Sequence, residues 1–345
     1  GCKACARECP TGVDMAKMKI EVLSARAKKN GVSLHERLIA YLPRYAPLAA
    51  RIPRVMNLRN TIPGLAKITE SITGFTAKRE LPRWSTRPFD NKELLAESNP
   101  KAVLFPDSFN RYFEPENLRA AIKVLQAANV SLSIAEAASG ERPLCCGRTF
   151  LAAGLIDEAR IEARRLIEAL LPYASKGIPI IGLEPSCLLT LRDEIPSLIP
   201  GEQTALLARQ ARMLEEYITD QDENEEFVIP LKSPAPKIML HGHCHQKAMG
   251  VMTSIGRTLA LLPDTEIETI ETSCCGMAGA FGYGTDTYDI SLKMAEADLL
   301  PAVRRADPET LIVADGTSCR HQIRDITDRN PIHIARLLEL ALNSE

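Results

Sequence analysis

Two adjacent cysteines followed by a glycine occur twice in this chain, at Cys145-Cys146-Gly147 and at Cys274-Cys275-Gly276. Neighbouring cysteines make a poor disulfide because the ring that they close is strained, so their thiols pair elsewhere or bind metal. The glycine lets the backbone approach a bulky ligand and adopt a positive φ. One copy alone could be two buried cysteines that act as small apolar residues. Recurrence in register with further cysteines favours a metal site.

Three more cysteines stand at the start of the chain. Cys2, Cys5 and Cys9, followed by Pro10, match the later part of the ferredoxin pattern C-x2-C-x2-C-x3-C-P, whose thiolates hold a [4Fe-4S] cluster. A zinc knuckle is the alternative. The first cysteine of the pattern would lie before Gly1. We therefore expect the sequence to begin inside a ferredoxin motif and residues 1–10 to lack the ligands for a complete cluster.

Composition limits the classes of function. A chain of 345 residues, 45% hydrophobic and 25% charged, suggests a soluble globular protein of two or three domains. The net charge of −2 argues against nucleic acid and anionic membranes as partners. No apolar run approaches the roughly 18 residues of a membrane span. The 10 cysteines are too sparse for a secreted disulfide scaffold, so metal binding in a reducing compartment is favoured.

The first part of the chain is predicted to be helical. From Val13 to about Thr73, apolar residues recur at helical spacing, and Ser33 with Glu36 forms a capping-box pattern. Prolines at positions 43, 47, 53 and 63 are expected to break this segment into short helices. Residues 83–88 have the composition of a linker. The arginines of this region indicate a solvated or partner-facing surface.

After residue 100 the chain consists of two repeats that can be aligned by hand. Each has an apolar strand, a helix, a second strand, the Cys-Cys-Gly turn, an amphipathic helix, and a last apolar strand that leads to Ser-Cys. In the first repeat these segments are 101–105, 115–128, 131–134, 156–171 and 178–181, before Cys187; in the second they are 237–241, 246–262, 266–270, 288–302 and 310–313, before Cys319.

Strands that alternate with helices predict an α/β fold with mainly parallel sheets. The acidic residues 220–226 are expected to form a solvated loop between the repeats. We expect three parts: a ferredoxin remnant with a helical linker region at 1–99, a first, degenerate repeat at 100–226, and a second repeat at 227–345.

The cysteines of the second repeat are predicted to converge on one metal. Cys244, Cys274, Cys275 and Cys319 each follow a predicted strand, and the carboxyl ends of parallel strands meet at one crevice. Four thiolates suit an iron–sulfur cluster or zinc, but zinc ligands come in close pairs, so the long gaps here favour a polynuclear cluster.

The first repeat has an incomplete set of thiols. It retains Cys145, Cys146 and Cys187, but Ser108, beside Asp107, occupies the position of Cys244. Either this repeat holds a cluster with an oxygen or external fourth ligand, or it is a decayed copy kept for packing and docking. We favour the second interpretation.

Glycines and histidines surround the thiols of the second repeat. Gly276, Gly279, Gly282 and Gly284 would let backbone N–H groups approach cluster sulfurs, and such hydrogen bonds raise the reduction potential. This run does not open a helix directly after a strand, as a dinucleotide-binding loop requires. His241, His243 and His245 flank Cys244 and would point away from it if the strand continued. They are ordinary loop or core histidines, or they support the metal, ligate it or relay protons. We expect Gly276, Gly279, His243 and His245 to contribute to cofactor binding.

The motifs resemble a known family. The runs 241–248, 274–279 and 314–320, with the tandem repeats, resemble the CCG family of heterodisulfide reductase B subunits and of the iron–sulfur parts of glycolate and lactate oxidases. They are similar, more narrowly, to the C-terminal region of fused FAD-linked 2-hydroxy acid dehydrogenases, and residues 11–19 fit the same group. The missing ferredoxin cysteine, Ser108, and single cysteines where heterodisulfide reductase has C-x2-C are departures from the pattern.

The resemblance implies a function in electron transfer. It implies that FAD in a preceding flavin dehydrogenase domain oxidises a 2-hydroxy acid such as D-lactate or D-2-hydroxyglutarate. Electrons would pass through [4Fe-4S]-type clusters to a quinone or a carrier protein, in the cytoplasm or peripherally at the inner membrane. The fragment alone is not expected to oxidise substrate. A thiol/disulfide reductase of the heterodisulfide reductase type and a zinc or metal-free docking scaffold are the competing hypotheses.

Overall fold

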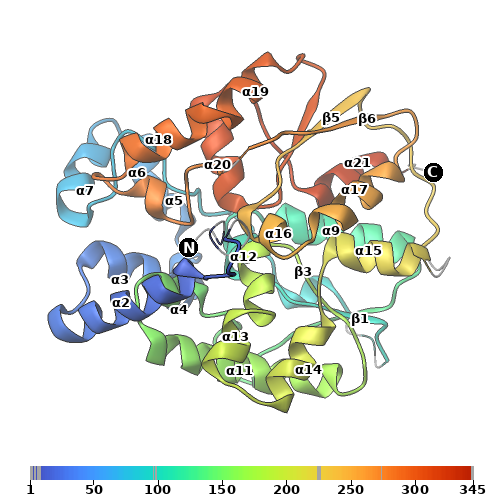
Figure 1. Ribbon diagram of the computed structural model, residues 1–345, viewed down its shortest axis with the longest axis horizontal. Coiled ribbons are helices and arrows are strands. Elements are labelled where there is room, and N and C mark those ends of the chain that lie inside the picture. The colour runs from blue at the N-terminus through green and yellow to red at the C-terminus, as the bar shows by residue number, and fades with distance from the viewer. Residues whose placement is uncertain are drawn as a thin grey trace.

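The computed structural model describes residues 3, 5, 9–95, 97, 99–223, 227–272 and 274–342. Over these residues the chain is an α/β protein with two parallel sheets, each covered by helices, and a lobe of short helices at one side (Figure 1). The predicted fold class, tandem α/β repeats preceded by a helical segment, is therefore confirmed.

The N-terminal lobe is helical, as predicted. Its helices are α2 (Met15–Asn30), α3 (Leu34–Ala40), α4 (Leu42–Ala49), α5 (Pro53–Met56), α6 (Leu58–Thr61) and α7 (Leu65–Thr73). Ser33 and Glu36 form the expected capping box at the start of α3. The predicted break at Pro47 is wrong, because α4 continues through this residue. A proline can lie inside a helix if the structure tolerates the loss of one backbone hydrogen bond.

The first repeat forms a sheet with strand order β2-β1-β3-β4. Its strands are β1 (Ala102–Leu104), β2 (Leu132–Ile134), β3 (Ile180–Gly182) and β4 (Ala211–Met213). Its helices are α8 (Ser108–Tyr112), α9 (Pro115–Ala127), α10 (Arg148–Ala152), α11 (Ile156–Ala174), α12 (Pro185–Leu188), α13 (Glu194–Leu198), α14 (Glu202–Gln210) and α15 (Leu214–Glu223). The predicted acidic loop at 220–226 is wrong for residues 220–223, which end α15; residues 224–226 lie outside the described part of the chain.

The second repeat forms a sheet with strand order β6-β5-β7. Its strands are β5 (Lys237–Leu240), β6 (Glu266–Thr269) and β7 (Leu311–Val313), and its helices are α16 (Cys244–Ala248), α17 (Met252–Ala260), α18 (Tyr288–Ala297), α19 (Leu299–Arg305), α20 (Thr317–Ile326) and α21 (Ile334–Ala341). Two predicted helices are each divided, at 249–251 and at Asp298. Pro301 contributes to the second break, because it has no N–H to continue the hydrogen bonds of α18.

The two repeats share their backbone register. In the first, the N–H of Phe105, just after β1, donates to the Ile181 carbonyl at 2.8 Å. In the second, the N–H of His241, just after β5, donates to the Val313 carbonyl at the same distance. The central strand of each repeat therefore ends against the last predicted strand in the same way, and the residues that follow are structurally equivalent.

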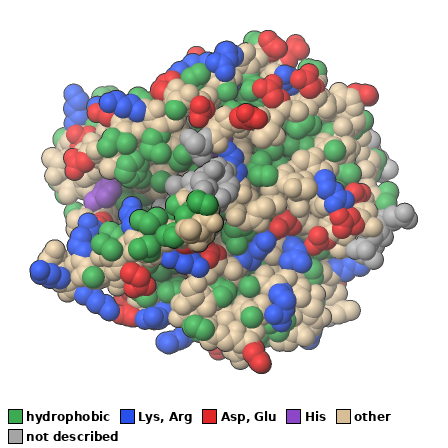
Figure 2. Space-filling model, viewed as in Figure 1, with side chains coloured by type: hydrophobic (Ala, Val, Ile, Leu, Met, Phe, Trp, Pro, Cys, Tyr) green, Lys and Arg blue, Asp and Glu red, His purple; other side chains and the backbone are tan. Residues whose placement is uncertain are grey.

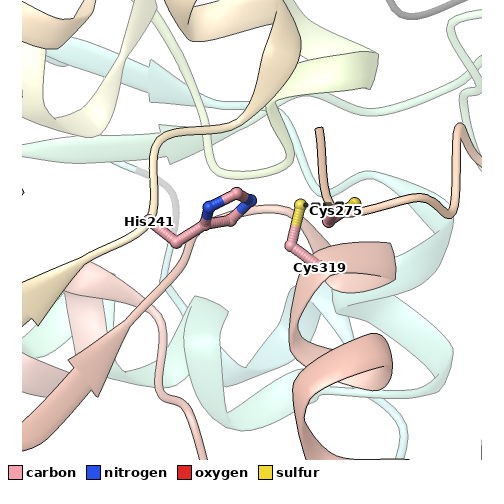
Figure 3. Close-up of side chains that lie close together, drawn as sticks. All are labelled: His241, Cys275 and Cys319. Atoms are coloured by element: carbon pink, nitrogen blue, oxygen red, sulfur yellow. Dashed lines mark hydrogen bonds between the residues drawn. The ribbon is translucent and has the colours of Figure 1, made fainter. Parts of the chain in front are cut away.

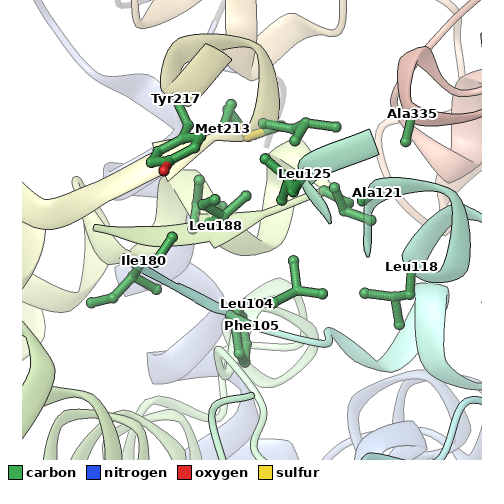
Figure 4. Close-up of a cluster of buried hydrophobic side chains, with 14 of the residues drawn as sticks. Leu104, Phe105, Leu118, Ala121, Leu125, Ile180, Leu188, Met213, Tyr217 and Ala335 are labelled. Carbon is green, nitrogen blue, oxygen red and sulfur yellow. The ribbon is translucent and has the colours of Figure 1, made fainter. Parts of the chain in front are cut away.

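A common hydrophobic core joins the repeats. The largest cluster of buried apolar side chains includes residues of β1, β3 and β4 together with Ile238 and Leu240 of β5 and Ile334 of α21. Figure 4 shows Ala335 of α21 beside Leu118 and Ala121 of α9. At the sheet ends, a carboxylate oxygen of Glu184, which caps α12, also accepts a hydrogen bond from the N–H of Thr317 at 2.9 Å. The helices that carry Cys187 and Cys319 are thus joined at their starts.

Candidate metal centre

Four thiols of the second repeat come together at the carboxyl ends of its strands. Cys244 is the first residue of α16, Cys274 and Cys275 follow β6, and Cys319 lies in the first turn of α20. The Sγ atoms of Cys244 and Cys274 are 4.0 Å apart, and those of Cys275 and Cys319 are 3.3 Å apart. None of the described cysteines forms a disulfide. The structure therefore brings together the four residues that the sequence singles out as ligands.

The turn that carries Cys274 and Cys275 depends on Gly276. Gly276 has φ +82°, and its N–H donates to the Cys274 Sγ at 3.2 Å. A Cβ at this position would overlap the carbonyl oxygen of Ser291 in α18. Gly147 in the first repeat has φ +81°, and its N–H lies 3.3 Å from the Cys145 Sγ. In both repeats the glycine thus holds a positive φ and directs an amide at the first thiol.

The surroundings of the second set favour thiolates, the form in which cysteine binds metal. Hydrogen bonds with Cys244, Cys275 and the Gly276 amide lower the pKa of Cys274 to about 2. A hydrogen bond with Cys275, together with the nearby imidazoles of His241 and His243, holds the pKa of Cys319 well below its usual value. Hydrogen bonds with both neighbouring thiols, and burial, raise the pKa of Cys275. A metal cation at the centre of the set would supply the positive charge that a third and fourth thiolate need.

The three histidines do not lie as an extended strand would place them. The strand β5 ends at Leu240, and His243 already caps α16, where its Nδ1 accepts from the His245 N–H at 3.2 Å. The strand does not continue, so the expectation that His241, His243 and His245 all point away from Cys244 does not apply. A Cβ at Gly316 would overlap the His243 ring and lie 3.2 Å from the Cys319 Sγ, so imidazole and thiol occupy one side of this loop.

The first repeat offers a different environment to its three thiols. Ser108 starts α8, and the carboxylate of Asp107 accepts hydrogen bonds from the N–H groups of Phe109 and Asn110. A hydrogen bond from Cys146 lowers the pKa of Cys187, but burial and the charges of Asp107 and Glu184 outweigh it and raise this pKa to about 12. A hydrogen bond with Cys146, and burial, raise the pKa of Cys145 well above normal. The bond with Cys145 lowers the pKa of Cys146, but a hydrogen bond with Cys187 and burial outweigh it and raise this pKa as well. The two carboxylates thus oppose ionisation of Cys187, whereas the surroundings in the second repeat favour ionisation of Cys274 and Cys319.

The start of the chain, for which the sequence predicts a ferredoxin motif, packs against this region. Cys2 lies outside the described residues; the hydroxyl of Thr11, 3.1 Å from the Cys9 Sγ, lowers the pKa of Cys9. Lys3 is buried, and its Nζ lies 2.8 Å from Asp14, 2.5 Å from Asp193 and 3.1 Å from Glu194.

The same Glu194 pairs with Arg148, which follows the first Cys-Cys-Gly turn. Another nitrogen of Arg148 lies 3.2 Å from the His245 Nε2. Three segments that carry cysteines therefore meet around one guanidinium. Lys3, Glu194 and Arg148 were not predicted from the sequence. Their only signal was that Lys3 and Arg148 lie directly beside cysteine motifs.

The comparison with protein families agrees with the duplicated architecture. The cysteine-rich domain family designated CCG matches twice, over residues 105–192 and 238–324, which together make up half of the chain. The chain belongs to the CCG family. Both Cys-Cys-Gly turns, both Ser-Cys segments and the Cys244 helix of this CCG protein fall within the matched residues.

Individual relatives come from two groups of dehydrogenases. The chain is 25% identical over 326 residues to one of the subunits of the anaerobic glycerol-3-phosphate dehydrogenase of Escherichia coli strain K12, a match that covers 92% of this chain and 80% of that protein. It is 23% identical over 362 residues to the D-2-hydroxyglutarate dehydrogenase of the same strain and 25% over 351 residues to that of Pseudomonas putida.

The two matches to D-2-hydroxyglutarate dehydrogenases cover 98% and 96% of this CCG protein but only 34% and 33% of the two enzymes. The chain thus spans about a third of these enzymes. The predicted kinship with the CCG region of 2-hydroxy acid dehydrogenases is confirmed.

Proposed function

We propose that this chain is the iron–sulfur electron-transfer module of a flavin-dependent 2-hydroxy acid dehydrogenase. The observation that carries the proposal is the convergence of Cys244, Cys274, Cys275 and Cys319 at the ends of parallel strands. Their largely buried position and the hydrogen-bonding amide of Gly276 match what iron–sulfur clusters require from a protein. Relatives named as dehydrogenases, which cover nearly the whole chain, agree with this proposal.

The donor set fits a cluster. Under this proposal the four cysteines of the second repeat would hold it, with Gly276, Gly279, His243 and His245 around it, and Cys2, Cys5 and Cys9 would belong to a [4Fe-4S] ferredoxin site. Such clusters gain and lose single electrons. Cys145, Cys146 and Cys187 form the weaker candidate set, because the pKa values of all three thiols are raised and the charges of Asp107 and Glu184 act on Cys187. This chain's residues fix ligand positions, exclude water and set the local charge.

The flavin and the substrate belong to other parts of the intact protein or to a partner protein. We propose that FAD on a flavin dehydrogenase domain takes the electrons from a 2-hydroxy acid, and that a quinone or a carrier protein receives them from this module. The pairing of Lys3 with Glu194 and of Glu194 with Arg148 supports a route from the ferredoxin segment to the second repeat, because it places these segments side by side. Thiolate ligands favour a cytoplasmic location.

Exposed apolar side chains concentrate on the N-terminal lobe, on the left in Figure 2. On α4–α7 and the turns between them they are Leu48, Ile52, Val55, Met56, Leu58, Ile62, Ile68 and Ile72. Arg51, Arg54 and Lys67 are exposed on the same segment, whereas Arg44 is paired with Glu158 and Glu162. No helix among the described residues has the length and apolar character of a membrane span. An exposed apolar surface with basic side chains fits a peripheral contact with an anionic membrane, which we propose for this lobe despite the nearly neutral chain.

A vesicle flotation experiment tests this membrane contact, because binding should depend on anionic lipid. The protein is expected to float with vesicles of phosphatidylglycerol and phosphatidylcholine, less at high salt, and not with phosphatidylcholine vesicles alone. The double variant Ile52→Glu/Val55→Glu should lose most of this binding. The matched control Ile290→Glu/Met294→Glu changes two exposed apolar residues of α18 and should keep it. Equal binding by both variants would show that this lobe is not the membrane contact.

Metal analysis tests the proposed function itself. Anaerobically purified protein is expected to contain iron and acid-labile sulfide and to give an EPR signal on reduction, and Cys275→Ala should lose the signal of the second repeat. The matched control Cys146→Ala removes the equivalent thiol of the first repeat and should keep it. Zinc without sulfide would establish a structural site, and a signal that changes when a disulfide substrate is added would establish a thiol/disulfide reductase.

A further inference from the structure

His241 lies closer to the thiols than its neighbours in the sequence suggest. It follows β5 directly and is only 1% exposed. One of its ring nitrogens and the Sγ atoms of Cys275 and Cys319 all lie within 4.8 Å of one another. Figure 3 shows the imidazole directed toward the two sulfur atoms. Iron in a cluster can bind imidazole nitrogen as well as thiolate, as in Rieske centres, where two histidines replace two cysteines on one iron.

The two ring nitrogens have different surroundings. The Nδ1 lies 3.3 Å from the Thr272 hydroxyl, to which the Lys247 ammonium also donates. The Nε2 is buried and has no hydrogen-bond partner among the described residues. If the Nδ1 carries the proton and donates it to Thr272, the Nε2 keeps a lone pair beside the thiols. Metal-bound histidines commonly hold the other ring N–H in this way.

The first repeat supplies an internal comparison. Phe105 occupies the position of His241 and makes the equivalent backbone hydrogen bond, but its side chain has no donor atom. Ser108 likewise stands where the second repeat has Cys244. The repeat that lacks the fourth thiol therefore also lacks the imidazole, and both differences remove a metal donor at the same end of the sheet.

We infer that the Nε2 of His241 is a metal ligand of the second repeat, bound alongside the cysteine thiolates. The inference rests on the proposed iron–sulfur function and adds a nitrogen to its donor set. Because the added ligand is a neutral imidazole, the cluster is less negative than it would be with a fifth thiolate, and its reduction potential is higher. Thr272 acts as a positioning residue that fixes the ring and its tautomer.

The decisive test is the identity of the atoms bound to iron. The protein is loaded anaerobically with ferrous iron and sulfide and studied by pulsed EPR, once with natural nitrogen and once with ¹⁵N-labelled histidine. We expect a strong histidine nitrogen coupling that changes with the label and is lost in His241→Phe, the residue of the first repeat. His321→Asn is the control, because this nearby histidine binds the Tyr283 hydroxyl at 2.8 Å and should leave the coupling intact.

Two further variants separate ligation from packing. His241→Cys is expected to retain iron, lose the nitrogen coupling and lower the reduction potential, which a purely structural histidine would not do. Thr272→Val should weaken iron affinity by about 10-fold through loss of the partner that orients the ring. An iron–sulfur cluster without histidine coupling, or with the weak coupling of a hydrogen bond to sulfur, would overturn the inference. Protein without iron would refute the proposed function instead, and a strong histidine coupling that persists in His241→Phe would assign the ligand to another histidine and overturn the inference.

Discussion

Replacing Glu114 with alanine is expected to destabilise the fold by about 3–5 kcal/mol, because it leaves a buried guanidinium without its counter-charge. Arg320, which follows Cys319, is 1% exposed and forms an ion pair with Glu114, just before α9 of the other repeat. Its Nη1 donates to the carbonyls of Ala314 and Asp315, both at 2.7 Å. Urea denaturation of the metal-free protein measures the change in the free energy of unfolding.

The same ion pair gives a second readout in the dependence of stability on pH. Burial raises the pKa of Glu114, but the charge and hydrogen bonds of Arg320 outweigh it and lower this pKa to about 2, from 4.5 in the unfolded chain. Because the folded pKa is the lower one, the stabilisation is complete above pH 4.5. It is lost as the pH falls toward 2, and its size is on the order of 3 kcal/mol.

Two variants control the Glu114 experiment. Glu116→Ala removes an exposed carboxylate two residues away and should change stability by less than about 0.5 kcal/mol. The double variant Glu114→Leu/Arg320→Met removes both charges and should recover most of the loss, because an apolar pair needs no desolvated charge. If Glu114→Ala were as stable as the wild type above pH 5, the ion pair would not join the repeats as described.

Replacing Gly276 with alanine is expected to cost about 3–5 kcal/mol and to displace Cys274 and Cys275. The added Cβ would meet the Ser291 carbonyl oxygen, and a φ of +82° costs about 1–2 kcal/mol for any residue with a Cβ. The backbone must shift, which removes the hydrogen bond from the Gly276 N–H to the Cys274 Sγ. Urea denaturation measures the stability, and iron content after reconstitution measures the site.

Two other glycines separate crowding from backbone strain. Gly279 has φ +78°, and a Cβ at this position would meet none of the described residues within 4 Å, so Gly279→Ala should cost only the roughly 1–2 kcal/mol of its backbone conformation. At Gly147 the Cβ would lie 3.0 Å from the Ala159 carbonyl oxygen, which predicts an intermediate loss. Equal losses at Gly276 and Gly279 would show that contact with α18 does not govern the turn.

The repeated segments could be predicted because each has a strong local pattern. The apolar runs 101–105 and 237–241 form β1 and β5. The cysteines of the second repeat lie just after strand ends, where the sequence predicted them. β4 was missed because Ala211-Arg212-Met213 is only three residues long and lies directly between two helices, too short for an alternating pattern to stand out. The domain boundaries and the roles of the site residues remain predictions.

Contacts between distant segments could not be predicted in this way. The direction of His241 depends on where β5 ends, one residue before it, and a strand end is the least reliable feature of a sequence pattern. The pairing of Lys3 with Glu194 and of Arg320 with Glu114 arises only when the helices pack together. Charge alone predicts no partner for these residues, because the chain contains many other acidic side chains.

The first repeat has a consequence for any attempt to shorten the protein. A fragment of residues 227–345 would lose Glu114 as the partner of Arg320, Glu184 as the cap at Thr317, and Arg148 as the neighbour of His245. The smallest autonomous unit is therefore the pair of repeats. The repeat with fewer thiols supports the other one structurally, because Glu114, Glu184 and Arg148 hold its helices in position.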